Sequence, residues 1–233
     1  MNVLDRLWDR VSGSQPLPPS WVIAATALAA LIVVTSNGSW RVAGKVITIA
    51  HEGGHALVSL LSGRKLDGIR LHADSSGVTY SRGRRYGPGL VATSAAGYLA
   101  PPLLGAGAAW LLAAGHETAM LWLTLVLLVA TLLAIRNAFG ALAVLVTAAG
   151  VFAVSYFASA AVQAGFAYLA VWFLLLGGVR PVLELPRRRT YRTGLTDADQ
   201  LAQLTRVPRG VWVTLFLLVC AACLAVGARL LIP

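Results

Sequence analysis

The sequence predicts an all-α polytopic membrane protein with six to seven transmembrane helices and one small β-hairpin between the second and third. Composition is the first reason: 58% of the 233 residues are hydrophobic and only 12% are charged. An average soluble domain carries about 25% charged residues, so this chain has too few to cover a water-facing surface. The second reason is that apolar stretches near the ~20 residues needed to cross a bilayer recur along nearly the whole chain.

Seven apolar segments account for most of the chain. They lie at about residues 21–36, 41–62, 88–114, 117–135, 138–154, 156–179 and 210–231. The first and fifth are short for a span, so the expected number of crossings is six or seven. We therefore expect an N-terminal tail over residues 1–20 and a single integral-membrane domain over 21–233, interrupted by polar stretches at 63–87 and 180–209.

The first polar stretch has the alternation of apolar and polar residues that is typical of strands. Residues 65–72 and 77–82 alternate in this way on either side of the turn-forming residues 74–77. This pattern predicts a β-hairpin, with a solvated connector as the alternative. A hairpin beside a membrane helix leaves one strand edge open, and such an edge can pair with an extended peptide.

Basic residues indicate how the chain is oriented. The net charge is +10, and most Lys and Arg residues lie in the stretches 63–87 and 180–209. With seven spans, a cytoplasmic N-terminus places both basic stretches and Arg136 on the cytoplasmic side. Such loops also suit anionic lipid, so the lipid bilayer is an expected partner. No RNA- or DNA-binding module is visible, and nucleic acid is not an expected partner.

The second apolar segment contains the motif with chemical meaning, His51-Glu52-Gly53-Gly54-His55. Residues four apart lie on one face of a helix, so both imidazoles can bind one metal ion. Glu52 is rotated by about 100° from His51 and can reach a water molecule without being a ligand, which suits a general base. A charged residue in a membrane segment costs ~2.5 kcal/mol or more and by default indicates function. The alternative is a polar network that braces the bundle.

A catalytic zinc ion normally has three protein ligands, so a third must come from elsewhere in the chain. Asp197 and Asp199 in the second polar stretch are candidates, and Glu184 stays open. The other acidic residues lie in the terminal tail, the hairpin or an outer turn: Asp5, Asp9, Asp67, Asp74 and Glu117. The pattern around Asp197 also predicts a short amphipathic helix with Thr196 or Asp197 as N-cap.

The segment around His51 and His55 resembles the site-2 protease family of intramembrane zinc metalloproteases. The whole chain is similar to a small bacterial branch of that family without a PDZ domain, and the likeness covers most of residues 40–215. Further similar segments are Gly97-Tyr98-Leu99-Ala100-Pro101, Arg136-Asn137-Ala138-Phe139-Gly140 and Thr196-Asp197-Ala198, followed by Leu201, Pro208 and Trp212. The larger family places its aspartate in an Asn-x-x-Pro…Leu-Asp-Gly motif, which this chain lacks.

The resemblance implies specific roles for four residues. His51, His55 and Asp197 would bind Zn²⁺, with Asp199 as the nearest substitute for Asp197, and Glu52 would activate the attacking water. The implied reaction is hydrolysis of peptide bonds in a membrane-embedded, single-pass substrate protein at a bacterial cytoplasmic membrane. Asn137 would either orient a substrate strand or cap the helix that follows it.

Two other functional classes compete with this interpretation. One is a non-catalytic membrane adaptor or chaperone that retains a protease-like bundle. The presence of all three residues, His51, Glu52 and His55, speaks against it. The other is a transporter that handles a metal ion or protons at the same cluster. Transporters often contain inverted repeats, and the sequence shows no convincing internal repeat.

Overall fold

The computed structural model describes residues 13–191 and 195–232. Within them the chain forms eight helices and a two-stranded antiparallel sheet, which confirms the predicted fold class. In chain order the elements are α2 (Ser20–Thr35), α3 (Asn37–Leu61), β1 (Lys65–Leu71), β2 (Gly77–Arg82), α4 (Pro88–Ala113), α5 (Glu117–Ala134), α6 (Ala138–Phe157), α7 (Ala160–Tyr191), α8 (Asp197–Thr205) and α9 (Arg209–Leu231).

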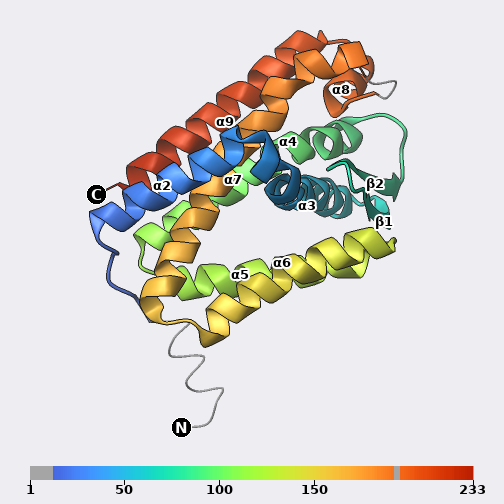
Figure 1. The fold of residues 1–233 in the computed structure, drawn as a ribbon. Coiled ribbons are helices and arrows are strands. Elements are labelled where there is room, and N and C mark those ends of the chain that lie inside the picture. Colours follow the sequence, from blue (N-terminus) through green and yellow to red (C-terminus); the bar gives the residue numbers. More distant parts are fainter. Residues whose placement is uncertain (1–12, 192–194, 233) are drawn as a thin grey trace.

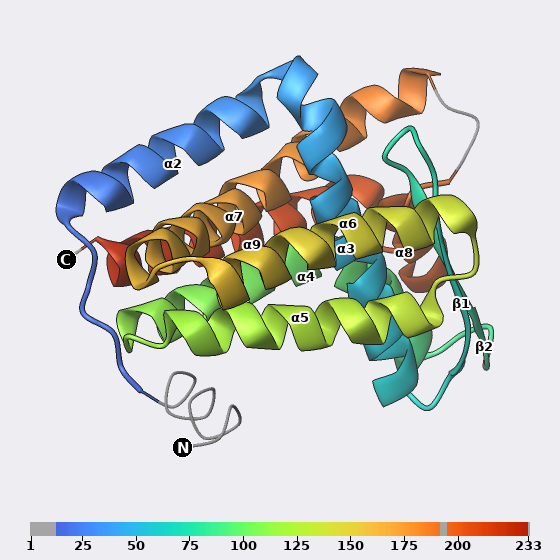
Figure 2. The same ribbon diagram turned by 60° about the horizontal axis from the view of Figure 1, so that its bottom comes forward.

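Helix α3 crosses the remaining long helices, which run along a shared direction (Figures 1 and 2). It packs most extensively against α4, and α4 packs in turn against α7 and α9. The short helix α8 lies against α4 and α9 at the end of the bundle that also bears the hairpin. This arrangement places α3, the hairpin and α8 around one region of the molecule.

The number of spans is at the low end of the prediction. Five helices of the described chain are long and apolar enough to cross a membrane, and α2 and α3, bent by 101° to each other, give a sixth candidate if they form one span. The described residues contain no seventh candidate. Helix α2 has 16 residues, or about 24 Å at 1.5 Å per residue, which is short of the ~30 Å hydrocarbon core. Helix α3 contains the polar His-Glu-x-x-His motif and does not qualify as a span by itself.

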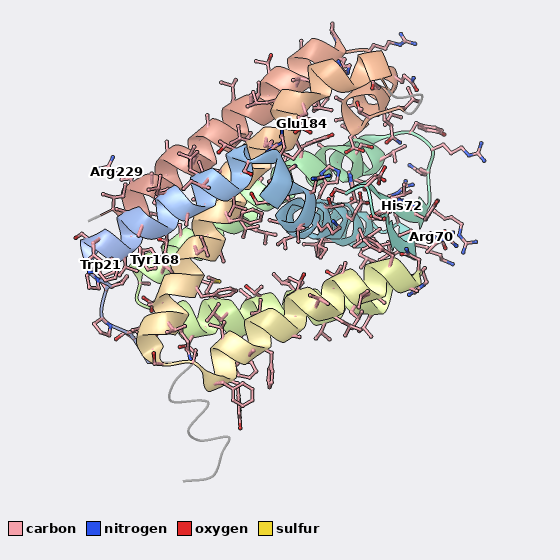
Figure 3. All side chains as sticks on the ribbon, viewed as in Figure 1. Trp21, Arg70, His72, Tyr168, Glu184 and Arg229 are labelled. Atoms are coloured by element: carbon pink, nitrogen blue, oxygen red, sulfur yellow. The ribbon has the colours of Figure 1, made fainter. Side chains whose placement is uncertain are left out.

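The two ends of the described chain lie opposite the hairpin. The backbone N–H of Gln15 donates to the Gly115 carbonyl (2.8 Å) at the α4–α5 turn. Figure 3 shows Trp21 and Arg229 at one end of the bundle and Arg70 at the other. Residues 13–19 therefore lie at the end of the bundle opposite the basic hairpin, whereas the seven-span arrangement placed both on the cytoplasmic side. An arrangement in which α2 and α3 form one bent span, with a 101° bend, would separate them in this way. Residues 1–12 of the predicted tail lie outside the described residues.

The second polar stretch is more helical than predicted. Helix α7 continues through the expected start of a basic loop at residue 180 and ends at Tyr191, and α8 occupies residues 197–205. Residues 183–190 combine good helix formers (Leu, Glu and Arg) with Pro186, which disfavours a helix interior, so local propensity alone does not explain the extension. Residues 192–194 lie outside the described chain.

The predicted hairpin is present, with β1 and β2 antiparallel and a bulge between Leu66 and Gly68. Its β1 edge is covered, because Ile135 forms a parallel bridge to Ile69. The Asn137 side chain continues this pairing: its Nδ2 donates to the Leu71 carbonyl (2.7 Å), and its Oδ1 accepts from the Leu71 N–H (3.2 Å). Asn137 thus holds a strand of its own hairpin and makes no side-chain cap for α6. No strand of the described chain pairs with the outer edge of β2.

Candidate metal centre

Helix α3 presents His51 and His55 one turn apart, with their Nε2 atoms 3.1 Å from each other. Glycine in α4 makes room for the two rings. A Cβ atom at Gly97 would lie 2.4 Å from the His55 Nε2 and 2.6 Å from the His51 Nε2. A Cβ at Gly54 would lie 2.4 Å from the Cβ of Ala100. Helices α3 and α4 can approach this closely only because both positions lack a side chain.

The tautomer of His55 follows from its partner on α4. The His55 Nδ1 lies 2.6 Å from the backbone carbonyl of Thr93, which can only accept a hydrogen bond. Nδ1 therefore carries a proton, which leaves Nε2 as the nitrogen that can bind a metal. A histidine that ligates a metal commonly has its second nitrogen fixed in this way. His51 packs edge-on against the Tyr98 ring, with the ring centroids 4.7 Å apart.

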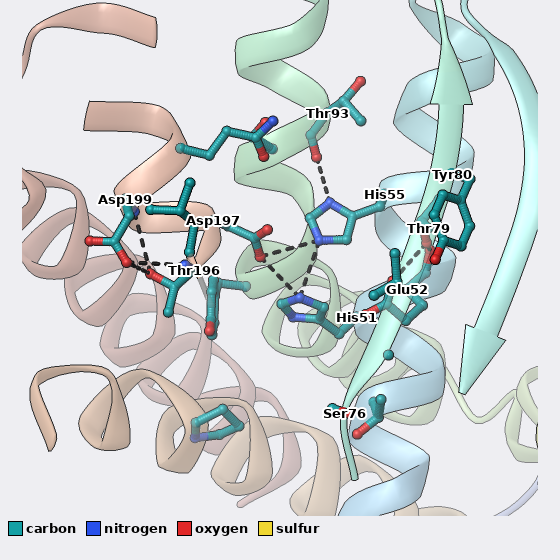
Figure 4. A pocket seen from close by; sticks show the side chains of 18 of the residues that line it. His51, Glu52, His55, Ser76, Thr79, Tyr80, Thr93, Thr196, Asp197 and Asp199 are labelled. Atoms are coloured by element: carbon teal, nitrogen blue, oxygen red, sulfur yellow. Dashed lines mark hydrogen bonds and ion pairs between the residues drawn. The ribbon is translucent and has the colours of Figure 1, made fainter. Parts of the chain in front are cut away.

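Helix α8 contributes the third side chain. Asp197 Oδ2 lies 3.1 Å from His51 Nε2 and 3.2 Å from His55 Nε2. Figure 4 shows Asp197 pointing toward both imidazoles. Burial alone would raise the pKa of Asp197, but its hydrogen bonds and charge interactions with the two histidines hold that pKa below its usual range. Asp197 is therefore an anion facing two imidazole nitrogens.

Asp199 has a different role. Its Oδ2 accepts from the backbone N–H of Thr196 (3.0 Å), and the Thr196 hydroxyl accepts in turn from the Asp199 N–H, which completes a capping box at the start of α8. The Arg209 Nε lies 2.9 Å from Asp199 Oδ1, and the same guanidinium donates to the Leu185 carbonyl of α7. Asp199 thus fixes α8 against its neighbours. The third candidate, Glu184, pairs with Arg180 at 3.0 Å and is not part of the cluster.

The three side chains fit a tetrahedral zinc ion. Their ligand atoms all lie within 4.8 Å of one another. Zinc bound at about 2.0–2.1 Å from tetrahedral ligands sets those ligands about 3.3 Å apart, close to the separations of His51, His55 and Asp197. Two imidazoles and one carboxylate also match the donor types of known catalytic zinc sites. Such a set leaves room for a fourth, non-protein ligand.

Glu52 lies beside this centre and is only 4% exposed. The centre and Glu52 together line a groove of ≈ 1150 Å³ between α3, β2, α4 and α8. The hydroxyl of Thr79, on β2, donates to Glu52 Oε2 at 2.7 Å. The hairpin therefore contacts the proposed base directly, and the groove runs along the strand whose outer edge is unpaired.

Several residues that build this site have no recognisable signal in the sequence. Gly77 and Thr79 lie two residues apart in β2, so the strand period predicts that they share one face. The sequence does not predict that Glu52 lies next to that face. Arg209 had no local signal, because its partner Asp199 lies on another helix. Thr93 contacts His55 through its backbone carbonyl, which every residue type has, so the sequence could not identify it.

Fold and site together define a polytopic helical membrane protein with a candidate His-His-Asp metal centre next to a buried glutamate. The model of the Peptidase M50B-like family matches residues 24–227. This match spans most of the chain, so the protein belongs to that family, within the site-2 protease family. Comparison with curated proteins and with solved structures found no match.

Proposed function

We propose that this protein is an intramembrane zinc metalloendopeptidase in which Glu52 is the general base. The observation that carries the proposal is the convergence of His51, His55 and Asp197 beside Glu52 in one groove. Membership in a peptidase family supports the same reaction class. When bound, zinc supplies Lewis-acid activation of water and of the scissile carbonyl.

The side chains of the site have separate tasks in this reaction. Glu52 accepts a proton from the attacking water on its carboxylate and returns it to the leaving amine. The Thr93 carbonyl keeps the Nδ1 of His55 protonated and its Nε2 free for the metal. Asp197 provides the negative charge that completes the ligand set.

The open edge of β2 is the proposed receiving site for the substrate. A transmembrane helix has all its backbone groups hydrogen-bonded internally, so a segment must unwind before it can be cut. Unwound backbone needs new partners, and the unpaired edge of β2 beside the groove can provide them by strand addition. The substrate class is accordingly a membrane protein, in the simplest case with a single span, whose cleaved segment becomes extended.

The hairpin end of the molecule is the proposed cytoplasmic end. The exposed Arg70, Arg82 and Arg84 belong to the hairpin region, and Arg206 follows α8 at the same end. Cytoplasmic loops carry an excess of Lys and Arg, so this end faces the cytoplasm of a bacterial membrane, with residues 13–19 on the opposite side. The site then opens near the cytoplasmic interface.

Removal and return of the metal test the proposal. Purified protein should contain about one zinc per chain and cleave a membrane-embedded test substrate. Chelation should abolish cleavage, and zinc should restore it. Single His51→Ala and His55→Ala variants should lose zinc and activity while keeping their helix content by circular dichroism. Full zinc occupancy in the double variant would refute the ligand assignment. If the protein binds zinc but cleaves no membrane substrate, the result would favour the adaptor or chaperone class. If it carries zinc or protons across liposome membranes, the result would favour the transporter class.

A further inference from the structure

Strand β2 touches both oxygens of the Glu52 carboxylate. The Thr79 hydroxyl lies 2.7 Å from Oε2 and 3.1 Å from the backbone carbonyl of the same glutamate. On the other side, a Cβ atom at Gly77 would lie 2.7 Å from Oε1 and 2.6 Å from the Glu52 Cγ. The strand backbone therefore lies directly on the carboxylate, which Figure 4 shows between the two histidines and the strand.

These contacts restrict a side chain that would otherwise rotate. Glutamate has three side-chain torsions, and a general base must sit within hydrogen-bond reach of the proton that it removes. A carboxylate only accepts hydrogen bonds, so the hydroxyl of Thr79 is the donor. Threonine is β-branched and stiff at χ1, which makes this hydroxyl a well-placed donor. The hydrogen bond from Thr79 to Oε2 therefore fixes the orientation of the carboxylate.

We propose that Thr79 is a positioning residue that orients Glu52 for proton transfer, and that it links the base to the strand that receives the substrate. This inference rests on the proposed function. Thr79 contacts the base and not the substrate or the metal ligands, so its loss should slow turnover without weakening substrate binding or zinc binding. Pairing of a peptide with the outer edge of β2 would stabilise the strand in the position that holds Glu52.

The test replaces the hydroxyl and keeps the shape. Thr79→Val should lower kcat by about 10- to 100-fold, the usual effect of losing a partner that orients a site residue, with KM and zinc content unchanged. Thr79→Ser keeps the donor and should restore most of kcat. Thr147→Val is the matched control, because the Thr147 hydroxyl donates to the Ala143 carbonyl within α6, and this variant should behave as wild type. In a Glu52→Gln background, Thr79→Val should have little further effect on kcat.

A second readout does not depend on catalysis. Infrared difference spectra of Thr79→Val against wild type should show a shift of one carboxylate stretching band, and that band should be absent from Glu52→Gln. A wild-type kcat in Thr79→Val, or equal losses in Thr79→Val and Thr79→Ser, would overturn the proposal, as would an unchanged carboxylate band. If wild type cleaves nothing, the proposed function fails, and the proton-transfer role of Thr79 fails with it. The infrared shift still decides separately whether Thr79 holds the carboxylate.

Discussion

Asp197 and Asp199 both lie in the first turn of α8, yet their carboxylates face different partners. Asp197 faces His51 and His55, whereas Asp199 is bound by Thr196 and Arg209. One side chain can supply a metal ligand because the other fixes the helix that presents it. The charge of Asp197 matters for this role, because a carboxylate ligand binds a metal ion in its deprotonated form.

Substitutions at the two aspartates should separate ligand from support. Asp197→Asn keeps the size of the side chain but removes its charge. Loss of a residue that only hydrogen-bonds to a metal ligand typically lowers metal affinity by about 10- to 100-fold, and Asp197→Asn should lower zinc affinity by more than this. Asp199→Ala should reduce zinc affinity less, through a loss of about 1 kcal/mol of capping energy in α8. Competition with a calibrated chelator measures both affinities. A larger effect at Asp199 than at Asp197 would move the third ligand by two residues.

At the scale of elements, the contact between α3 and α4 sets the geometry of the centre. Gly97 lies where α4 passes the two imidazoles, and Gly54 lies where α3 passes Ala100. Glycine lowers helix propensity by ~1 kcal/mol relative to alanine, so its use inside two packed helices indicates a steric requirement. Gly107, in the same helix, faces open space and has no such role.

This difference gives a matched pair of variants in one helix. Gly97→Ala should displace the histidines and abolish zinc binding, because the new Cβ would lie within 2.6 Å of both Nε2 atoms. Gly107→Ala meets nothing within 4 Å and should leave zinc binding intact, with up to about 1 kcal/mol of added helix stability. The zinc content of each purified variant measures metal binding, and circular dichroism measures whether its helix content is retained. Normal zinc content in Gly97→Ala would contradict the observed packing.

Local sequence patterns predicted the elements well, and long-range contacts explain the rest. Alternation predicted the hairpin, with a solvated connector as the alternative. The pattern around Asp197 predicted a short helix with Thr196 or Asp197 as N-cap, and Thr196 is the N-cap of α8. The bend between α2 and α3 was not predictable, because Arg180 of α7 holds it by donating to the Val34 carbonyl and to Asn37. The sequence narrowed the third ligand to a few acidic residues, and the packing of α8 against α4 and α9 brings Asp197 to the histidines.

At the scale of the whole molecule, the bent α2–α3 pair decides which parts share a side of the membrane. Counted as one crossing, it gives six spans in the described chain. Residues 13–19 and the end of α9 then lie at the end opposite the hairpin (Figures 1 and 3). The basic residues of the hairpin region and of the α8 region remain together at the other end, which keeps the arrangement consistent with positive-inside orientation.

Cysteine labelling in intact bacterial cells tests this topology. In a background with Cys220 and Cys223 replaced by serine, Ser14→Cys should react with a membrane-impermeant maleimide from outside. Arg84→Cys should react only after the cells are permeabilised. Both positions are exposed in the structure, so failure to react reports sidedness and not burial. Labelling of the two positions from the same side would contradict the six-span arrangement.

The central claim is that Glu52 moves the proton in a zinc-dependent peptide hydrolysis. The most direct measurement compares wild type and Glu52→Gln for zinc content and for turnover of a membrane-embedded test substrate in the same preparation. Both proteins should contain about one zinc per chain, and kcat should fall by about 10²-fold or more in the variant, because general acid–base catalysis contributes that much. Turnover by zinc-loaded Glu52→Gln at the wild-type rate would contradict it.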